Sequence, residues 1–295
     1  MKYLEKHPMI MIVVGILGIS MSAIFVKYST APSAVTAAYR LLWTVVLMSP
    51  VMLGNRRSRK ELFSAGWKTL LLSGISGIFL AIHFVVWFES LGHTSVASST
   101  TIVCTEVIWV ALGFCVFLKG RISFKAAAVI GVTFLGSVLI ALSDSASGGT
   151  HLYGDLLALI AAVAVAIYTL IGREVRKTAS TGVYTYIVYA TCAAALLLTC
   201  KVQDQSLFAY GYSAPIVGLL LAVFSTILGH SIFSWCLKFF SPAFVSASKL
   251  CEPVAAGLMA AFLFGEMPTL LQLLGSALVI GGVAVYSRIE RDGDG

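Results

Sequence analysis

Ten separate stretches of this chain are each long and apolar enough to cross a lipid bilayer as a helix. A hydrocarbon core of roughly 30 Å requires about 20 consecutive apolar helical residues per crossing. Little sequence remains for a soluble domain, so we expect an all-α integral membrane protein with ten transmembrane helices. The expected spans are residues 10–28, 33–53, 67–91, 95–118, 123–142, 152–172, 183–200, 214–237, 242–264 and 268–287.

Basic residues between these spans fall almost entirely on one side of the membrane. If successive spans cross the membrane in opposite directions, sixteen Lys and Arg residues lie on the side of the N-terminus. Only Lys27 and Lys201 lie on the other side. Short cytoplasmic loops are enriched in Lys and Arg, so we expect a multi-pass protein of the plasma (inner) membrane with both termini in the cytoplasm. The sixteen are Lys2, Lys6, Arg56, Arg57, Arg59, Lys60, Lys68, Lys119, Arg121, Lys125, Arg173, Arg176, Lys177, Lys238, Arg288 and Arg291.

The composition argues against several other classes of protein. Only 11% of the residues are charged and the mean hydropathy is +0.95, whereas soluble domains carry about 25% charged residues. The net charge of +7 is spread over cytoplasmic loops, where it orients helices and meets anionic lipid, so no nucleic-acid partner is expected. No Walker loop, HExxH motif or nucleophile elbow is present, and the six cysteines form no CxxC pair. We therefore expect no enzymatic activity, no cofactor and no metal site.

The two halves of the chain echo each other. His83 and His230 are 147 residues apart, and so are Cys104 and Cys251. The small polar segment 143–150 lies between the halves and is interpreted as a linker between two five-helix repeats, residues 1–145 and 146–295. Because five is an odd number of spans, the second repeat must be inserted upside down. The sequence thus predicts a 5+5 inverted repeat, an architecture of many secondary transporters whose substrate site lies near the membrane midplane.

Four ionisable residues lie deep inside the expected spans: Arg40 in span two, Glu106 in span four, and Lys249 and Glu252 in span nine. Each such residue costs roughly 2.5–3.5 kcal/mol to insert, so all four are candidates for substrate binding or ion coupling. Lys249 is one helical turn from Glu252 on the same face. A structural alternative stays open, in which Lys249 pairs with Glu252 or Glu106 and only ties helices together.

Histidine and tryptophan side chains in spans three and eight are further candidates: His83 and Trp87, and His230 and Trp235. Histidine titrates near neutral pH and can relay protons, although a hydrogen bond that packs helices together is the more frequent role. Tryptophan rings can contact a cationic or aromatic substrate, or simply pack. Counting from the span ends places His83 towards the outer face and His230 towards the inner face. We therefore expect them on opposite sides of a central cavity in which Glu106 and Glu252 lie close together.

Over essentially its whole length the chain resembles the EamA branch of the drug/metabolite transporter superfamily. The resemblance rests on five features of the sequence. They are Arg40 within the segment 38–42, His83 and Trp87 together with the segment 94–98, the segment 154–159, the motif Glu252-Pro253-Val254, and the segment 263–266. It implies a ten-helix carrier that usually exports amino acids, other metabolites or drugs by alternating access, often with proton exchange. This chain departs from the family pattern at Glu106, at Lys119-Gly120-Arg121 and at Lys249, so the resemblance does not name a substrate.

The expected function is secondary active transport of small polar metabolites, with export of amino-acid-like or amine compounds as the first choice and protons as a candidate coupling ion. The alternatives are import, or a membrane protein that does not transport, such as a lipid scramblase, an intramembrane enzyme or a receptor. Glu106 separates two interpretations. If it binds substrate or a proton, Glu106→Gln abolishes or uncouples transport and leaves folding intact. If it only neutralises Lys249, Glu106→Gln destabilises the protein and Lys249→Met restores it.

Overall fold

The structure is a computed structural model that describes residues 7–94, 96–144, 152–255, 258–259 and 269–291. The regular elements in these residues are helices. In chain order they are α2 Pro8–Ser20, α3 Ser22–Lys27, α4 Ser33–Gly54, α5 Arg56–Phe63, α6 Trp67–His93, α7 Val96–Val103, α8 Glu106–Phe117, α9 Phe124–Asp144, α10 Leu152–Val175, α11 Thr181–Val202, α12 Ser213–Leu220, η1 Leu221–His230, α13 Ser231–Cys236, α14 Pro242–Lys249 and α16 Leu270–Arg291.

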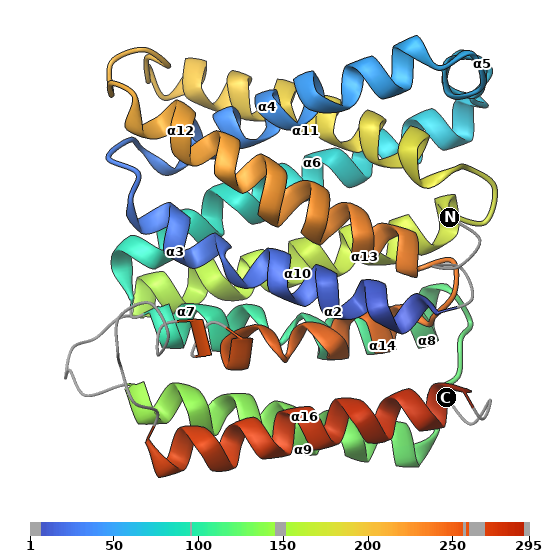
Figure 1. The fold of residues 1–295 in the computed structure, drawn as a ribbon, viewed down its shortest axis with the longest axis vertical. Coiled ribbons are helices and arrows are strands. Elements are labelled where there is room, and N and C mark those ends of the chain that lie inside the picture. Colours follow the sequence, from blue (N-terminus) through green and yellow to red (C-terminus); the bar gives the residue numbers. More distant parts are fainter. Residues whose placement is uncertain (1–6, 95, 145–151, 256–257, 260–268, 292–295) are drawn as a thin grey trace.

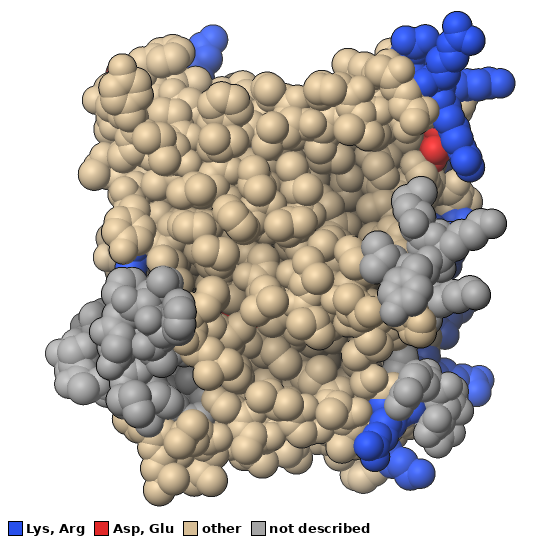
Figure 2. All heavy atoms as spheres, viewed as in Figure 1, with Lys and Arg blue, Asp and Glu red and all other residues tan. Residues whose placement is uncertain are grey.

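The long helices lie side by side and cross the same width of the molecule, so the chain turns at two opposite ends (Figure 1). Helix α2 begins and helix α16 ends at the same end, which also carries α5. Figure 2 shows that the Lys and Arg side chains of this face gather mainly at that end, while the broad middle is uncharged. The two described chain ends therefore share one side of the bundle, as the distribution of basic residues predicts.

The middle of the outer surface is apolar. Val13 and Val46 are each 55% exposed, and Leu135 is 59% exposed. Soluble monomers rarely expose a large contiguous apolar surface, whereas a bilayer covers one. Within the described residues, seven helices are long and apolar enough to span a membrane: Pro8–Lys27, Ser33–Gly54, Trp67–His93, Ser99–Phe117, Leu152–Val175, Thr181–Val202 and Ser213–Cys236. The structure is thus that of a multi-pass membrane protein.

The expected count of ten spans is confirmed only in part. The fifth and tenth expected spans correspond to α9, 21 residues, and α16, 22 residues, whose apolar parts Phe124–Leu139 and Leu273–Ile289 are not among the seven. The ninth expected span begins as α14, but much of its remainder lies outside the described residues. Most of the expected linker, residues 143–150, also lies outside them. The full set of ten therefore stays a prediction.

Two of the expected spans are interrupted by a turn near their middle. In span four, α7 ends at Val103 and α8 begins at Glu106. In span nine, α14 ends at Lys249 and the chain becomes helical again at Glu252. Each interruption therefore places a glutamate at the first position of the helix that follows it. Interrupted helices at membrane depth are tolerated where they are buried in protein or line a cavity.

Local chemistry accounts for both interruptions. Pro253 has no backbone N–H, and its ring clashes with the carbonyl four residues earlier, that of Lys249, where α14 ends. In span four the Thr105 hydroxyl donates to the Ile102 carbonyl at 2.6 Å. This local bond competes with the regular helical ladder.

The eighth expected span contains a π-helix, η1, between α12 and α13. Thr226 Oγ1 donates to the Leu221 carbonyl at 3.2 Å, and Ser231 Oγ donates to the Thr226 carbonyl at 3.1 Å. Both hydroxyls thus reach a carbonyl five residues earlier, which fits the wider turn of a π-helix. Such turns are rare and frequently occur at functional sites.

Two apolar cores meet at the centre of the molecule. One joins buried side chains of α4, α6, α10, α11 and α12. The other joins buried side chains of α2, α8, α9, α13, α14 and α16. Each core combines helices from both halves of the sequence, so the halves interlock rather than fold as separate bodies.

Close packing between α6 and α11 requires a glycine at one position. A Cβ added at Gly77 would lie 2.5 Å from the Val188 carbonyl oxygen, whereas one added at Gly74 meets nothing within 4 Å. We expect Gly77→Ala to destabilise the protein by about 1–3 kcal/mol through overpacking. The matched control Gly74→Ala should be neutral or stabilising by up to ~1 kcal/mol, because alanine favours helix. Thermal unfolding in detergent measures both, and equal melting temperatures would contradict this packing.

Candidate functional site

A small cavity lies where the two cores meet. Its walls come from α2, α3, α4, α6, α7, α8, α10, η1 and α14, and it is lined by Ile19, Ser22, Arg40, His83, Trp87, Thr100, Val103, Glu106, Val165, Ser225, His230, Lys249 and Glu252. Seven of the eight residues singled out in the sequence are among these. The predicted convergence of spans three, four, eight and nine on one cavity, with both glutamates in it, is therefore observed.

The cavity has a volume of about 40 Å³. One water needs roughly 10–15 Å³ measured this way, so the space accommodates about three waters. Ligand pockets are usually much larger, roughly 300–1,000 Å³. In this conformation the site is closed around a space too small for a metabolite.

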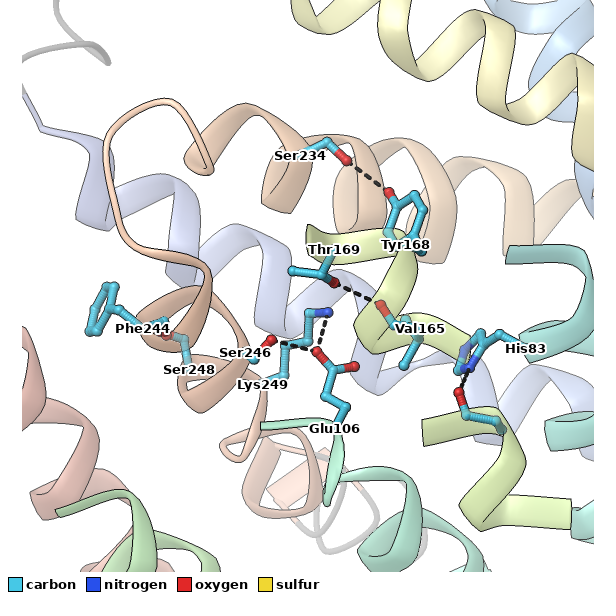
Figure 3. Close-up of polar contacts among 11 residues, drawn as sticks. His83, Glu106, Val165, Tyr168, Thr169, Ser234, Phe244, Ser246, Ser248 and Lys249 are labelled. Carbon is cyan, nitrogen blue, oxygen red and sulfur yellow. Dashed lines mark hydrogen bonds and ion pairs between the residues drawn. The ribbon is translucent and has the colours of Figure 1, made fainter. Parts of the chain in front are cut away.

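Glu106 and Lys249 form a buried ion pair across the cavity. Lys249 Nζ lies 2.8 Å from Glu106 Oε1, and the Ser246 hydroxyl donates to the same oxygen at 2.7 Å (Figure 3). The side chains are only 10% and 6% exposed. The pair joins the start of α8 to the end of α14, which are 143 residues apart in the chain. Of the two partners considered for Lys249, the structure thus selects Glu106.

Glu252 lines the same cavity without a protein partner for its carboxylate. No hydrogen bond or ion pair to this carboxylate occurs within the described residues, although its backbone carbonyl accepts from Ser20 Oγ at 3.3 Å. The two glutamates, alike in sequence context, therefore differ in state. One is neutralised by a lysine and the other is available to a ligand.

Arg40 is the second charge on the cavity that lacks a counter-charge. Its side chain is 1% exposed, and Nε donates to Thr226 Oγ1 at 2.7 Å while Nη1 contacts Ser22 Oγ at 3.4 Å. The guanidinium also lies over the Phe84 ring, 4.0 Å from its centroid. No carboxylate pairs with it in the described part of the chain. These contacts hold Arg40 in place and leave its guanidinium without a directly bonded carboxylate among the described residues.

Buried polar atoms without a protein partner gather at this cavity. Within the described residues seven buried side-chain polar atoms lack one, and four of them belong to cavity-lining residues: Arg40 Nη2, Trp87 Nε1, Thr100 Oγ1 and Ser225 Oγ. A buried polar group without a hydrogen bond costs about 1–3 kcal/mol. Their concentration here indicates that the wall is arranged to bind something other than protein.

Aromatic rings form one wall of the cavity. His83 stacks on Trp87 with centroids 5.9 Å apart, and His230 meets Phe84 edge-on at 5.3 Å. His83 Nδ1 lies 3.0 Å from the Ala161 carbonyl oxygen. Since a carbonyl only accepts, Nδ1 is the donor, which ties α6 to α10. This contact is the inter-helix hydrogen bond that the sequence left open as an alternative to proton relay.

Two geometric expectations are wrong. The rings of His83 and His230 are 6.3 Å apart in an edge-on contact, so these residues are neighbours at one depth and not on opposite sides of the cavity. Trp235 does not line the cavity. It packs on Phe239, with centroids 4.4 Å apart, at the border of the second core. Depth was assigned by counting residues from the ends of each expected span, which assumes straight helices along the membrane normal. Helices α12, η1 and α13 instead run obliquely (Figure 1).

Several polar residues of the site were missed in the sequence: Ser22, Thr100 and Ser225, which line the cavity, and Ser246, which bonds Glu106. Hydroxyl side chains are common in apolar helices, where they bond a carbonyl of the preceding turn. Nothing in the local sequence separates those that face a cavity from the rest. No group of three His, Cys, Asp or Glu side chains that could hold a metal occurs within the described residues.

Comparisons with known proteins agree along the whole chain. A sequence profile described as the EamA-like transporter family matches twice, over residues 7–142 and 152–288. An uncharacterized transporter of Archaeoglobus fulgidus is 25% identical over 97% of this chain and 99% of its own. The uncharacterized transporter YwfM of Bacillus subtilis is 27% identical over 79% of this chain and 78% of its own. A solved crystal structure with 18% identity has the same fold, with a TM-score of 0.79 over 98% of this chain and 99% of that one.

Proposed function

Since this chain belongs to the EamA-like transporter family, we propose that it is a secondary active transporter that moves small polar metabolites through the central cavity. The observation that carries this proposal is the presence of two opposite charges, Arg40 and Glu252, on one closed cavity, neither of which has a direct ion-pair partner among the described residues. An isolated charge buried in a membrane protein is expensive and marks a functional site by default. A ligand that neutralises both charges offsets that cost.

The substrate class follows from the polar groups on the cavity wall. Arg40 Nη2 and Trp87 Nε1 are donors suited to an anionic group, and the Glu252 carboxylate suits an ammonium group. A compound with both charges satisfies the site better than a simple amine, because an amine leaves Arg40 without a counter-charge. We therefore propose an amino-acid-like substrate. Export is proposed as the direction of transport because the family resemblance implies it, and the cavity wall does not bear on it.

Proton coupling is proposed for Glu252 in preference to Glu106. A carboxylate can hold either a proton or the ammonium group of a substrate, but not both. Alternate binding of the two would exchange protons for substrate across the membrane. Glu106 is less suited to this role because Lys249 and Ser246 already occupy the same oxygen.

Alternating access would come from an inverted arrangement of repeats 1–145 and 146–295 with ten spans. The helix contacts support this arrangement, because equivalent spans of the two repeats pack alike. Span three (α6) packs along span six (α10). Its equivalent in the second repeat, span eight (α12–η1–α13), packs along span one (α2). The interrupted spans four and nine are also equivalent and face each other through α8 and α14. Relative movement of such repeats would open a closed cavity to one side and then to the other.

The experiment has two steps. A thermal-shift screen of the purified protein against metabolites identifies a ligand, because a compound that binds the native state raises its melting temperature. Counterflow of that compound in liposomes then tests transport. We expect zwitterionic compounds to stabilise the protein and to exchange across the membrane. Lipid flip-flop or chemical conversion without counterflow would overturn the proposal in favour of a scramblase or an intramembrane enzyme.

The orientation in the membrane is a separate prediction. We expect the end that carries α5 and residues 173–177 to face the cytoplasm and residues 143–150, mostly outside the described part, to face outward, because short basic loops stay inside. In a cysteine-free background, Ser147→Cys should react with an impermeant thiol reagent in intact cells and Ser58→Cys should not. Labelling with the opposite pattern would reverse the topology.

A further inference from the structure

Helix α5 differs from the other helices in direction and in charge. It connects α4 to α6 at one end of the bundle, and in Figure 1 it is seen end-on while the long helices run across the view. Because the long helices are the candidate membrane spans, we expect α5 to lie along the membrane surface. Figure 2 shows a dense cluster of Lys and Arg side chains at this position.

The cations of α5 border a surface hollow. The hollow is lined by Arg56, Arg59, Lys60, Phe63 and Ser64 and has a volume of about 470 Å³. Arg56 and Lys60 have no protein acceptor within the described residues, and Arg59 makes one exposed contact, Nη1 to the Leu53 carbonyl at 3.3 Å. Three cations thus surround the hollow with no acidic side chain among its lining residues.

Two contacts hold α5 in this position. The Asn55 side chain caps the helix by accepting from the backbone N–H groups of Arg57 at 2.9 Å and Ser58 at 3.4 Å. Glu61, the one acidic residue in the α5 sequence, accepts from the Ser180 N–H at 2.7 Å. This bond connects α5 to the start of α11 and directs the Glu61 carboxylate to a partner outside the hollow.

The apolar neighbours of the cations identify the occupant. Phe63, which lines the hollow, is 77% exposed, and Trp67, at the start of α6 four residues further along the chain, is 74% exposed. Amphipathic interfacial helices place cations against headgroups and aromatic side chains against the upper acyl chains. A free phosphate would use the cations but not the aromatic rings. We propose that α5 and its hollow form a binding site for the phosphate headgroup of an anionic bilayer phospholipid.

The test compares lipid retention in matched variants. Wild-type protein in nanodiscs of mixed phosphatidylglycerol and phosphatidylcholine, examined by native mass spectrometry, should retain phosphatidylglycerol preferentially. Arg56→Gln/Arg59→Gln/Lys60→Gln should weaken that retention by roughly tenfold or more, since each cation near an anionic surface contributes appreciably. The control Lys119→Gln/Arg121→Gln/Lys125→Gln removes equal charge outside α5 and its hollow and should retain the lipid. Equal losses in both triple variants would overturn the site in favour of a diffuse charge effect.

A second variant keeps all cations and separates lipid from free phosphate. Phe63→Ser should weaken phosphatidylglycerol retention several-fold while insertion and folding are kept, because the side chain is exposed. Glycerophosphoglycerol, the soluble headgroup, should raise the melting temperature of the wild type little. Unchanged retention in Phe63→Ser, or a full stabilising effect of the soluble headgroup, would overturn a lipid site. These measurements do not involve the central cavity, so their outcome is independent of the proposed transport function.

Discussion

Replacing Glu106 by glutamine should destabilise the protein by about 3–5 kcal/mol, because it leaves the Lys249 ammonium buried without its counter-charge. The two charged atoms are 2.8 Å apart and both side chains are at most 10% exposed. The double variant Glu106→Gln/Lys249→Met should recover most of the lost stability, since replacing a buried ion pair by apolar groups is often neutral or stabilising. Melting temperatures of the three proteins in detergent measure the effect.

An exposed ion pair provides the matched control. Lys177 and Glu174 are 2.6 Å apart, but their side chains are 56% and 37% exposed. Glu174→Gln should change stability by less than about 1 kcal/mol, because surface pairs contribute little. If Glu106→Gln instead melts like the wild type and has lost transport, then Glu106 is the binding or coupling group and the pairing with Lys249 is secondary.

Replacing Glu252 by glutamine should have the opposite pattern. We expect transport of the metabolite found in the screen to fall by roughly 100-fold, because about 3 kcal/mol of interaction with its cationic group is lost. The melting temperature should be unchanged or higher, since the variant removes a partly buried carboxylate that has no protein partner among the described residues. Functional sites commonly trade stability for activity in this way. Counterflow and thermal unfolding on the same preparation separate the two effects.

The two tryptophans supply a control for position within the cavity. Trp87→Phe removes the unpartnered indole N–H from the cavity wall and should weaken substrate binding about tenfold. Trp235→Phe changes a ring that packs outside the cavity and should leave transport intact. Wild-type transport in Glu252→Gln, or equal losses in the two tryptophan variants, would show that the substrate binds elsewhere.

The candidate site was visible in the sequence because of where its charges lie. A bilayer tolerates few charged side chains, so Arg40, Glu106, Lys249 and Glu252 are conspicuous against an apolar background. The same argument does not extend to hydroxyl and aromatic side chains, which are common in membrane helices. Ser22 and Ser225 were therefore missed and Trp235 was wrongly included, although Trp235 follows His230 much as Trp87 follows His83.

The sequence by itself determined that the chain crosses a membrane several times, which end of the bundle is basic and which buried charges call for an explanation. These properties depend on the transfer of each side chain between water and lipid, which is local to the residue. Only the tertiary structure decided that Lys249 neutralises Glu106, that Glu252 has no such partner in the described part of the chain, and that the His83 and His230 rings meet. These outcomes depend on which helices pack together and on the turns at Thr105, Pro253 and η1, and contacts between residues more than a hundred positions apart are not encoded in any one helix.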